Sequence, residues 1–324
     1  MGESEEPRKL HVGCDVCSML PHVRAIECVP NISDGRHALV IDRIAGAVAT
    51  TRGVRLLDRS SDRDHHRTVL TMVGDATPIR DAVLAMMEAA VRLIDVRTHR
   101  GVHPRLGAVD VVPFIPLGEA TMAECADLAR VVAAEAARRL ALPMYLYEHA
   151  AIIPGRQRLE QLRRGQFEGL ASKMQDPTWR PDFGPGTPHV TAGATVIGAR
   201  DLLVAYNINL DTNQLELARQ VAAVIRESSG GLPHVKAMGV PLAERGIVQV
   251  SMNLTDFHVT PPSRVFARVR EEVEARGAKV LESEVIGLIP AAALADTTLE
   301  ALRLPASTAD RILERRLEAV GYRQ

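Results

Sequence analysis

The sequence has few of the features that indicate a membrane protein, a secreted disulfide scaffold or a nucleic-acid partner. No apolar run approaches the ~18 residues that suggest a membrane-spanning helix, and 39 Lys+Arg residues nearly balance 40 Asp+Glu residues. Four cysteines in 324 residues are typical of a reducing compartment. The N-terminal stretch MGESEEPRKL is acidic and polar, unlike a secretory signal. We therefore expect a cytoplasmic protein that binds neither nucleic acid nor membrane through its net charge.

The closely spaced cysteines Cys14 and Cys17 lack the further ligands of a structural zinc site. Such a site takes about four ligands, and no second CxxC accompanies this one. A redox pair would be expected at the start of a helix after a strand, whereas this segment has no clear periodic pattern. We expect the pair to be incidental and residues 1–22 to be an N-terminal extension.

From Arg24 onward, the chain carries strand and helix signals in the order β-α-β-β-α-β. Short β-branched runs predict strands, and apolar residues at helical spacing predict helices. The first helix is expected to begin at Ser33 or Asp34, and Thr77-Pro78 is expected to open the second, because proline is tolerated in a first helical turn. The expected strands cover residues 25–31, 54–60, 67–74 and 108–117, and the expected helices cover 33–50 and 79–95.

The same order begins again at Leu202, down to a Thr-Pro at the start of the second helix, Thr260-Pro261. The expected strands cover residues 202–210, 235–242, 246–256 and 279–290, and the expected helices cover 214–228 and 260–276. This order is that of the split βαβ, or ferredoxin-like, unit. We therefore predict an α/β (α+β) protein of two ferredoxin-like βαββαβ subdomains, packed with a ligand crevice or tunnel between them.

A long insertion, residues 122–200, separates the two halves. It is expected to contain a helix (122–140), a short strand (143–150) and a basic helical stretch (156–174). The prolines and glycines between Pro177 and Gly198 argue against regular structure over much of the remainder. Such a rigid loop suits close approach to a flat ligand. A plain interdomain linker is the alternative, but Trp179 and Phe183 are unusual in a linker.

The loop THRGVHPRLG concentrates side chains that handle protons and anions. His99, Arg100, His103 and Arg105 lie within a few residues of one another, directly before an apolar strand. Histidine titrates near neutrality, and the arginine fork matches carboxylates. The loop is therefore a candidate proton-transfer centre for an acidic substrate.

These segments resemble the formiminotransferase domain of the glutamate formimidoyltransferase family. The resemblance covers roughly Ile26 to Ala295 and is carried by residues 27–35, 56–69, 92–116, 145–151, 176–185 and 190–212. It implies two α/β subdomains that hold folate in a tunnel between them. The expected divisions are an N-terminal subdomain (23–183), a folate-contacting connection (184–200) and a C-terminal subdomain (201–324), after the extension of residues 1–22.

The resemblance also implies the reaction. The formimino group of N-formimino-L-glutamate would pass to N5 of tetrahydrofolate, the co-substrate, with release of L-glutamate. The family's catalytic histidine lies in an H-P-R motif, which is His103-Pro104-Arg105 here. A single imidazole with a pKa near 7 can take the proton from N5 and give one to the departing amine, so no metal is expected. A separate cyclodeaminase would process the product, and a homodimer is possible.

Other site residues are implied less strongly by the resemblance. The folate-contacting segment corresponds to Gly184, Pro185, Gly186, Thr187, Pro188, His189, Val190, Thr191, Ala192 and Gly193. His189 and His66 depart from the family pattern. Arg67 and Arg105 are candidates for substrate carboxylates, or equally for structural ion pairs. Asp58 is a candidate to orient His103 or bind the pterin, and Asn207 and Asn209 should share the strand face that lines the crevice.

Three alternatives to this function stay open at the level of sequence. Asp64-His65-His66 matches the short core of DHH-type metal phosphoesterases, although the further carboxylates of a two-metal site are missing. The motifs also do not exclude a folate-dependent transferase with another one-carbon donor, such as a formyl compound, or a folate binder without turnover.

Overall fold

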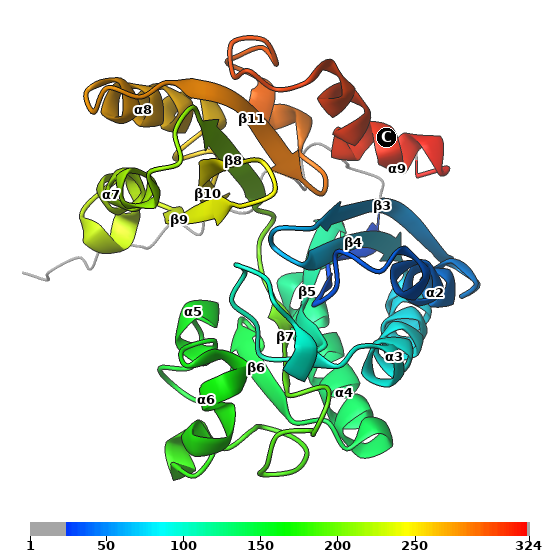
Figure 1. The fold of residues 1–324 in the computed structure, drawn as a ribbon. Helices are drawn as coiled ribbons and strands as arrows, with labels where there is room; N and C mark the ends of the chain where they lie inside the picture. Colours follow the sequence, from blue (N-terminus) through cyan, green and yellow to red (C-terminus); the bar gives the residue numbers. More distant parts are fainter. Residues whose placement is uncertain (1–23, 323–324) are drawn as a thin grey trace, which may run out of the picture.

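A computed structural model describes residues 24–322, so Cys14 and Cys17 lie outside the described residues. The first half is built on a seven-stranded sheet (Figure 1). Its strands are β1 (Arg24–Cys28), β2 (Asn31–Ile32), β3 (Val54–Asp62), β4 (Arg67–Gly74), β5 (Val109–Gly118), β6 (Met144–Glu148) and β7 (Thr195–Ala199). The order across the sheet is β3, β4, then β1 and β2 together, β5, β7 and β6. β7 pairs in parallel with both β5 and β6.

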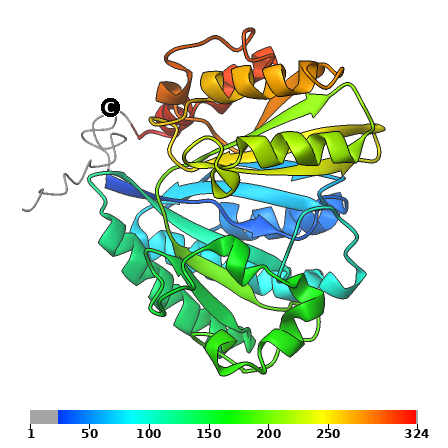
Figure 2. The ribbon, with the colours of Figure 1, turned by 90° about the vertical axis from the view of Figure 1, so that its left-hand side faces the viewer.

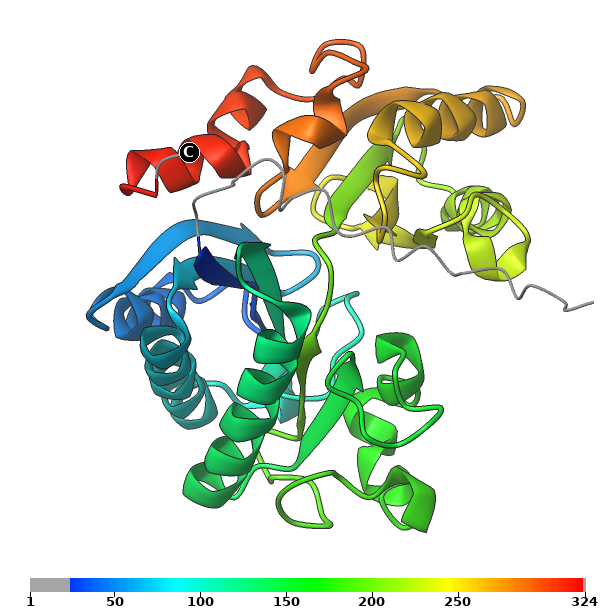
Figure 3. The ribbon, with the colours of Figure 1, turned by 180° about the vertical axis from the view of Figure 1, so that it is seen from behind.

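Three helices cover one face of this sheet: α2 (Ala38–Ala49), α3 (Ala76–Leu93) and α4 (Met122–Leu140). Their apolar sides form one core with the sheet, in which Ile44, Met86 and Val132 are fully buried. α4 lies beside α3 when the molecule is seen from behind (Figure 3). The insertion therefore widens the first sheet by two strands and one covering helix.

The second half is a four-stranded antiparallel sheet with α7 (Leu215–Ile225) and α8 (Pro262–Glu274) packed on one face. Its strands are β8 (Val204–Leu210), β9 (Val235–Leu242), β10 (Ile247–Leu254) and β11 (Val280–Ile286). The spatial order is β11-β8-β10-β9, which places the fourth strand of the unit beside the first and the third beside the second. The core strands of the first half have the same order. The predicted pair of ferredoxin-like units is confirmed.

The C-terminal segment returns to the first half. It contains the short helices η4 (Ala291–Leu294), η5 (Ala306–Arg311) and α9 (Leu313–Ala319), and α9 lies beside β3 (Figure 1). Arg316 donates to the carbonyl oxygen of Leu57 on β3, and Leu313 and Leu317 are buried in one hydrophobic cluster with Leu57. This segment and the second sheet cover the face of the first sheet that the helices leave free (Figure 2).

Two local expectations differ from the structure. The first helix begins at Ala38 rather than at Ser33 or Asp34, because the Asp34 carboxylate accepts the backbone N–H groups of Arg36 and His37 and holds a turn there. The strand β7 forms inside the Gly/Pro-rich stretch, where no strand was predicted.

The basic stretch 156–174 forms two short helices, α5 (Leu159–Leu162) and α6 (Gln166–Lys173), separated by a turn at Gly165 with φ +86°. Short 3-10 turns occur at η1 (Val96–Thr98), η2 (Pro177–Trp179) and η3 (Glu227–Ser229).

Candidate active site

His103 lies on a loop at the edge of the first sheet where β4 and β5 begin. The loop packs closely on the turn between β3 and β4: Val102 N–H donates to the carbonyl oxygen of Asp64 at 3.1 Å. A Cβ at Gly101 would lie 2.3 Å from the carbonyl oxygen of His65, so the loop approaches the turn closely only because residue 101 is glycine. The H-P-R motif is thus held against the β3–β4 turn.

The His103 ring accepts a hydrogen bond from an arginine. Arg67 Nη1 lies 2.8 Å from His103 Nε2, and because arginine only donates, Nε2 is the acceptor and the imidazole is neutral. Burial lowers the pKa of His103 well below its usual value, and the positive charges of Arg67 and Arg163 lower it further. His103 is therefore an unprotonated imidazole whose Nε2 lone pair is engaged by Arg67.

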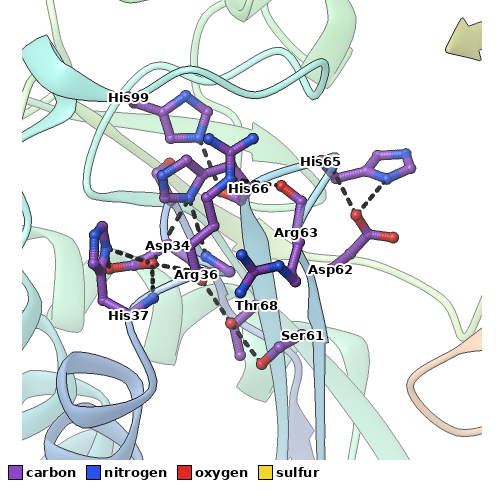
Figure 4. A network of polar contacts seen from close by, with 12 residues as sticks. Asp34, Arg36, His37, Ser61, Asp62, Arg63, His65, His66, Thr68 and His99 are labelled. Atoms are coloured by element: carbon purple, nitrogen blue, oxygen red, sulfur yellow. Dashed lines mark hydrogen bonds and ion pairs between the residues drawn. The ribbon is translucent and has the colours of Figure 1, made fainter. Parts of the chain in front are cut away.

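His37, His66 and His99 lie side by side next to the β3–β4 turn (Figure 4). The His66 and His99 rings stack with centroids 4.5 Å apart, and His99 Nε2 donates to the carbonyl oxygen of His66 at 2.8 Å. His66 has φ +52°, and its Nδ1 accepts the backbone N–H of Gly35 at 3.1 Å. Burial lowers the pKa of His66 to about 4 and lowers that of His99. His66 has a structural role, because it ties the β3–β4 turn to the segment before α2.

The two candidate arginines have different surroundings. Arg105 is buried and forms a two-pronged ion pair with Glu168 on α6, with its guanidinium nitrogens 2.6 and 3.1 Å from the carboxylate oxygens. Within residues 24–322, no carboxylate oxygen pairs with Arg67. Burial lowers the pKa of Arg67 to about 10. Arg105 thus anchors the loop to α6, whereas Arg67 donates to His103 and has no ion-pair partner in the described chain.

The second half presents polar side chains on the sheet face opposite its helices. Asn207 Nδ2 donates to Glu284 at 3.1 Å, and Asn209 Nδ2 donates to Glu282 at 3.1 Å. Gln249 on β10 donates to Asn209 and to Glu284, both at 2.8 Å. Glu282 and Glu284 were not among the predicted site residues, although their alternation on one strand is the same signal that identified Asn207 and Asn209.

Two cavities lie beside the His103 loop, and each is lined from both halves. The smaller has a volume of about 380 Å³. It is lined by Arg59, Ser60, Ser61, Asp62, Arg67, Glu284, Val285, Ile286, Pro305, Ser307, Thr308 and Arg311. The larger has a volume of about 810 Å³. It is lined by Arg36, Asp64, Arg97, His99, Arg100, Gly101, Val102, Arg105, Phe167, Glu168 and Ala243. His103 itself lines neither of these two cavities. Its hydrogen-bond partner Arg67 lines the smaller one, and its loop neighbours Gly101 and Val102 line the larger one.

The segment from Gly184 to Gly193 packs on the residues that flank the His103 loop. Its residues line neither of these two cavities. Thr191 and Ala192 accept backbone N–H groups of Val96 and Ala108 at 2.9 and 3.0 Å. His189 Nδ1 accepts the N–H of Ala192 at 3.0 Å, which closes a turn within the segment.

A side chain at position 193 would meet the protein itself. A Cβ on Gly193, which has φ +66°, would lie 2.1 Å from the carbonyl oxygen of Leu106 and 3.0 Å from the ring of Phe167. Phe167 in turn lines the larger cavity. Gly193 is therefore required by the packing of the segment against the loop and against Phe167.

Two aromatic residues anchor the Gly/Pro-rich stretch, as its content suggested. The Tyr145 hydroxyl donates to the carbonyl oxygen of Trp179 at 2.7 Å, and Lys173 Nζ lies 4.0 Å from the Trp179 ring centroid. Phe183 accepts the N–H of Met144 at 2.9 Å. The stretch is attached along β6 and is not a free linker.

Asp58 does not hydrogen-bond to His103, and Asp64, His65 and His66 do not form a metal site together. Asp58 accepts a hydrogen bond from Ser60 at 2.7 Å and makes none with His103. Asp64 accepts the N–H of Glu244 from the other half. In the described part of the chain, the one cluster with metal-ligand spacing is Asp34, His37 and His66, which includes neither Asp64 nor His65. The residues of the DHH motif therefore do not converge on one ion.

No helix within residues 24–322 is long and apolar enough to cross a membrane.

Comparison with known proteins gives matches over most of the chain. The family described as "Formiminotransferase domain, N-terminal subdomain" matches residues 25–200, and "Formiminotransferase domain" matches residues 205–301. A glutamate formimidoyltransferase of Streptococcus pyogenes serotype M1 is 44% identical over 273 residues, which are 84% of this chain and 91% of that protein.

Two further relatives cover the chain similarly. A glutamate formimidoyltransferase of Thermoplasma acidophilum is 42% identical, over 90% of this chain and 97% of that protein. A formimidoyltransferase-cyclodeaminase of Sus scrofa is 43% identical, over 84% of this chain and 51% of that protein.

Proposed function

The chain belongs to the formiminotransferase family, and on that premise we propose that it transfers the formimino group of N-formimino-L-glutamate to N5 of tetrahydrofolate. The products are 5-formimidoyltetrahydrofolate and L-glutamate. The enzyme is a folate-dependent transferase, and its reaction belongs to histidine degradation and one-carbon metabolism.

The observation that carries the proposal is the state of His103. Its imidazole is neutral, its unprotonated Nε2 is bonded to Arg67 of the smaller cavity, and its loop neighbours Gly101 and Val102 line the larger cavity. N5 of the folate attacks the formimino carbon, and a tetrahedral intermediate forms. His103 takes the proton that N5 loses and then gives it to the glutamate nitrogen as that nitrogen departs. No step in this route requires a metal ion or a covalent enzyme intermediate.

The larger cavity suits the folate. Its volume of about 810 Å³ is within the range of ~300–1,000 Å³ that holds small organic ligands. Phe167 and Val102 offer apolar surface for a flat ring, and Arg36 and Arg100 supply positive charge for an acidic tail. Arg97, which also lines this cavity, is ion-paired with Asp95. We infer that the segment 184–193, which does not line the larger cavity, supports this site through the packing of Gly193 on Phe167. Its exposed residues would contact the part of the folate that extends beyond the cavity.

Two single substitutions, Gly186→Val and Phe167→Ala, test this folate site. Gly186 is exposed, and a Cβ there meets no atom within 4 Å, so Gly186→Val should leave the melting temperature unchanged. Binding of folinate, a stable folate analogue, should weaken in Gly186→Val and in Phe167→Ala. Wild-type folinate affinity in both variants would contradict the placement of folate between Phe167 and this segment.

A donor screen tests the reaction itself. The purified chain, given tetrahydrofolate, should turn over N-formimino-L-glutamate far faster than N-formyl-L-glutamate, as followed by absorbance of the cyclised folate product. Faster transfer from the formyl compound would replace the proposed donor. Folinate binding without transfer from either donor would favour a folate binder over an enzyme.

A further inference from the structure

The smaller cavity is lined by three arginines and two carboxylates, Asp62 and Glu284. Asp62, Asp110 and Glu284 act on the Arg67 charge from a distance and raise its pKa, whereas burial and the Arg163 charge lower it. Arg311 Nη1 donates to the carbonyl oxygen of Val285 at 2.7 Å and to Ser60 Oγ at 3.3 Å, which are neutral partners. Within residues 24–322, neither Arg311 nor Arg67 has an ion-pair partner. Arg59, the third arginine of the lining, is paired with Asp42 at 2.5 Å. Two guanidinium groups, one from β4 and one from η5, thus line the cavity without an ion-pair partner in the described chain.

The acidic side chains of the same cavity are already engaged. Asp62 Oδ1 lies 3.0 Å from His65 Nδ1 and accepts the backbone N–H of His65. Glu284 accepts from Asn207 and Gln249. The remaining polar lining includes the hydroxyls of Ser61, Ser307 and Thr308. Arginine forks and hydroxyl donors are the groups that hold carboxylates.

Arg67 links this cavity to the catalytic imidazole. It lines the cavity, and its Nη1 also occupies the Nε2 lone pair of His103 at 2.8 Å. A lone pair that accepts from a guanidinium cannot accept a proton from a substrate at the same time. A carboxylate that bound Arg67 would compete for this donor and release the His103 lone pair.

We propose that the smaller cavity binds the two carboxylates of the glutamyl donor through Arg67 and Arg311, and that this binding draws Arg67 away from His103 and frees the imidazole for proton transfer. The proposal rests on the proposed function for the identity of the donor. It assigns Arg311, from the C-terminal segment beyond the matched residues 205–301, to substrate binding. Arg67 is both a carboxylate ligand and a positioning residue for His103.

The charged and titratable groups around His103 determine what a measurement of its pKa reports. They are Arg67 on β4, Arg163 after α5, His65 in the β3–β4 turn and His99 after η1. Arg163 is ion-paired with Asp110. Of these groups, Arg67 donates a hydrogen bond to the His103 ring and has no ion-pair partner in the described chain.

Direct binding of L-glutamate tests the site without turnover. Calorimetry should give a Kd for L-glutamate that rises at least about tenfold in Arg311→Gln and in Arg67→Gln, because each loses a charge-assisted hydrogen bond. Arg55→Gln, which changes an exposed arginine of β3 outside the cavity, should bind as the wild type does. Ser307→Asp adds a negative charge at an exposed lining residue and should also weaken binding tenfold or more, even if Arg311→Gln does not fold.

The release of His103 has its own spectroscopic signature. In nitrogen-15 NMR of the imidazoles, saturating L-glutamate should raise the pKa of His103 in the wild type. In Arg67→Gln the pKa should already be raised without ligand and should change little when glutamate is added. An unchanged His103 pKa in the wild type on binding glutamate would overturn the release mechanism.

The remaining outcomes separate this site from the proposed function. Wild-type glutamate affinity in Arg311→Gln or Ser307→Asp would overturn the site, even if the enzyme transfers formimino groups normally. Glutamate binding that depends on both residues, in a chain that transfers no formimino group, would support the site and reject the function. A third outcome is that Arg311→Gln and Ser307→Asp lose affinity for pteroylglutamate but keep wild-type affinity for L-glutamate and for pteroate. This outcome would assign the cavity to the glutamyl tail of folate and overturn the donor assignment.

Discussion

Replacing His66 by asparagine should remove much of the acid sensitivity of the fold. His66 is buried beneath His99 and neutral, with a pKa of about 4 against 6.5 for a free histidine. As pH falls through 6.5, the unfolded chain takes up a proton at this residue that the folded chain refuses, so stability falls with pH. Asparagine tolerates the φ of +52°, and its side-chain oxygen can accept the Gly35 N–H in place of Nδ1.

The magnitude follows from the two pKa values. At about pH 5, a group with pKa 6.5 in the unfolded chain and about 4 in the folded chain favours the unfolded chain by a factor of about 30. This factor corresponds to about 2 kcal/mol, of which little remains at about pH 7. Between these pH values, His66→Asn should therefore lose about 2 kcal/mol less stability than the wild type.

The assay is urea unfolding of the wild type and the variant at both pH values. Comparing the losses removes any constant cost of the substitution, such as the lost stacking on His99. His149→Asn is the control, because 54% of the His149 side chain is exposed, and it should lose about as much stability as the wild type. If His66→Asn lost the same free energy as the wild type between the two pH values, His66 would not be held neutral by burial.

Two further predictions concern the support of the His103 loop. Gly193→Val should lower the free energy of unfolding by about 2 kcal/mol or more, because its Cβ would lie 2.1 Å from the Leu106 carbonyl oxygen at a φ of +66°; a wild-type melting curve would refute this. Glu168→Ala should lower the unfolding free energy by about 2 kcal/mol, because it leaves the buried Arg105 charge without its carboxylate. Arg105→Met should cost less, since it removes that charge and keeps apolar volume, and the opposite order in urea unfolding would contradict this account of the pair.

Much of the fold could be predicted because local signals agree with the final structure. The helix expected at 122–140 has those bounds, since Thr121 and Glu124 form a capping box at its start. The strands expected at 67–74 and 235–242 also have the predicted limits. In both halves the order β-α-β-β-α-β was sufficient to predict the topology. The order could be read from the sequence because a helix or strand with one buried face has a regular spacing of apolar residues.

The errors occur where tertiary contacts override the local signal. Asp34 looked like the start of a helix, but its carboxylate closes a turn four residues before the helix begins. β7 was missed because a strand buried between β5 and β6 needs few local signals of its own. Sequence could not decide between a structural and a binding role for Arg105 and Arg67. The answer depends on Glu168, which is distant in sequence, and on the absence of a carboxylate partner for Arg67 in the described chain.

Arg311 could not be found from sequence at all. It follows the second copy of the unit, in a segment with no motif, and reaches the cavity only because α9 and η5 fold back on β3. The catalytic candidate was accessible to sequence reasoning because His103 lies in a motif, whereas the groups around it come from distant segments.

The most direct test of the account is the turnover of His103→Ala compared with its folate binding. If His103 transfers the proton between N5 and the departing glutamate nitrogen, kcat with N-formimino-L-glutamate and tetrahydrofolate should fall by ~10²–10⁴. Folinate affinity and the melting temperature should stay close to those of the wild type. A folded His103→Ala variant that keeps the wild-type kcat would remove His103 from the mechanism and contradict the account.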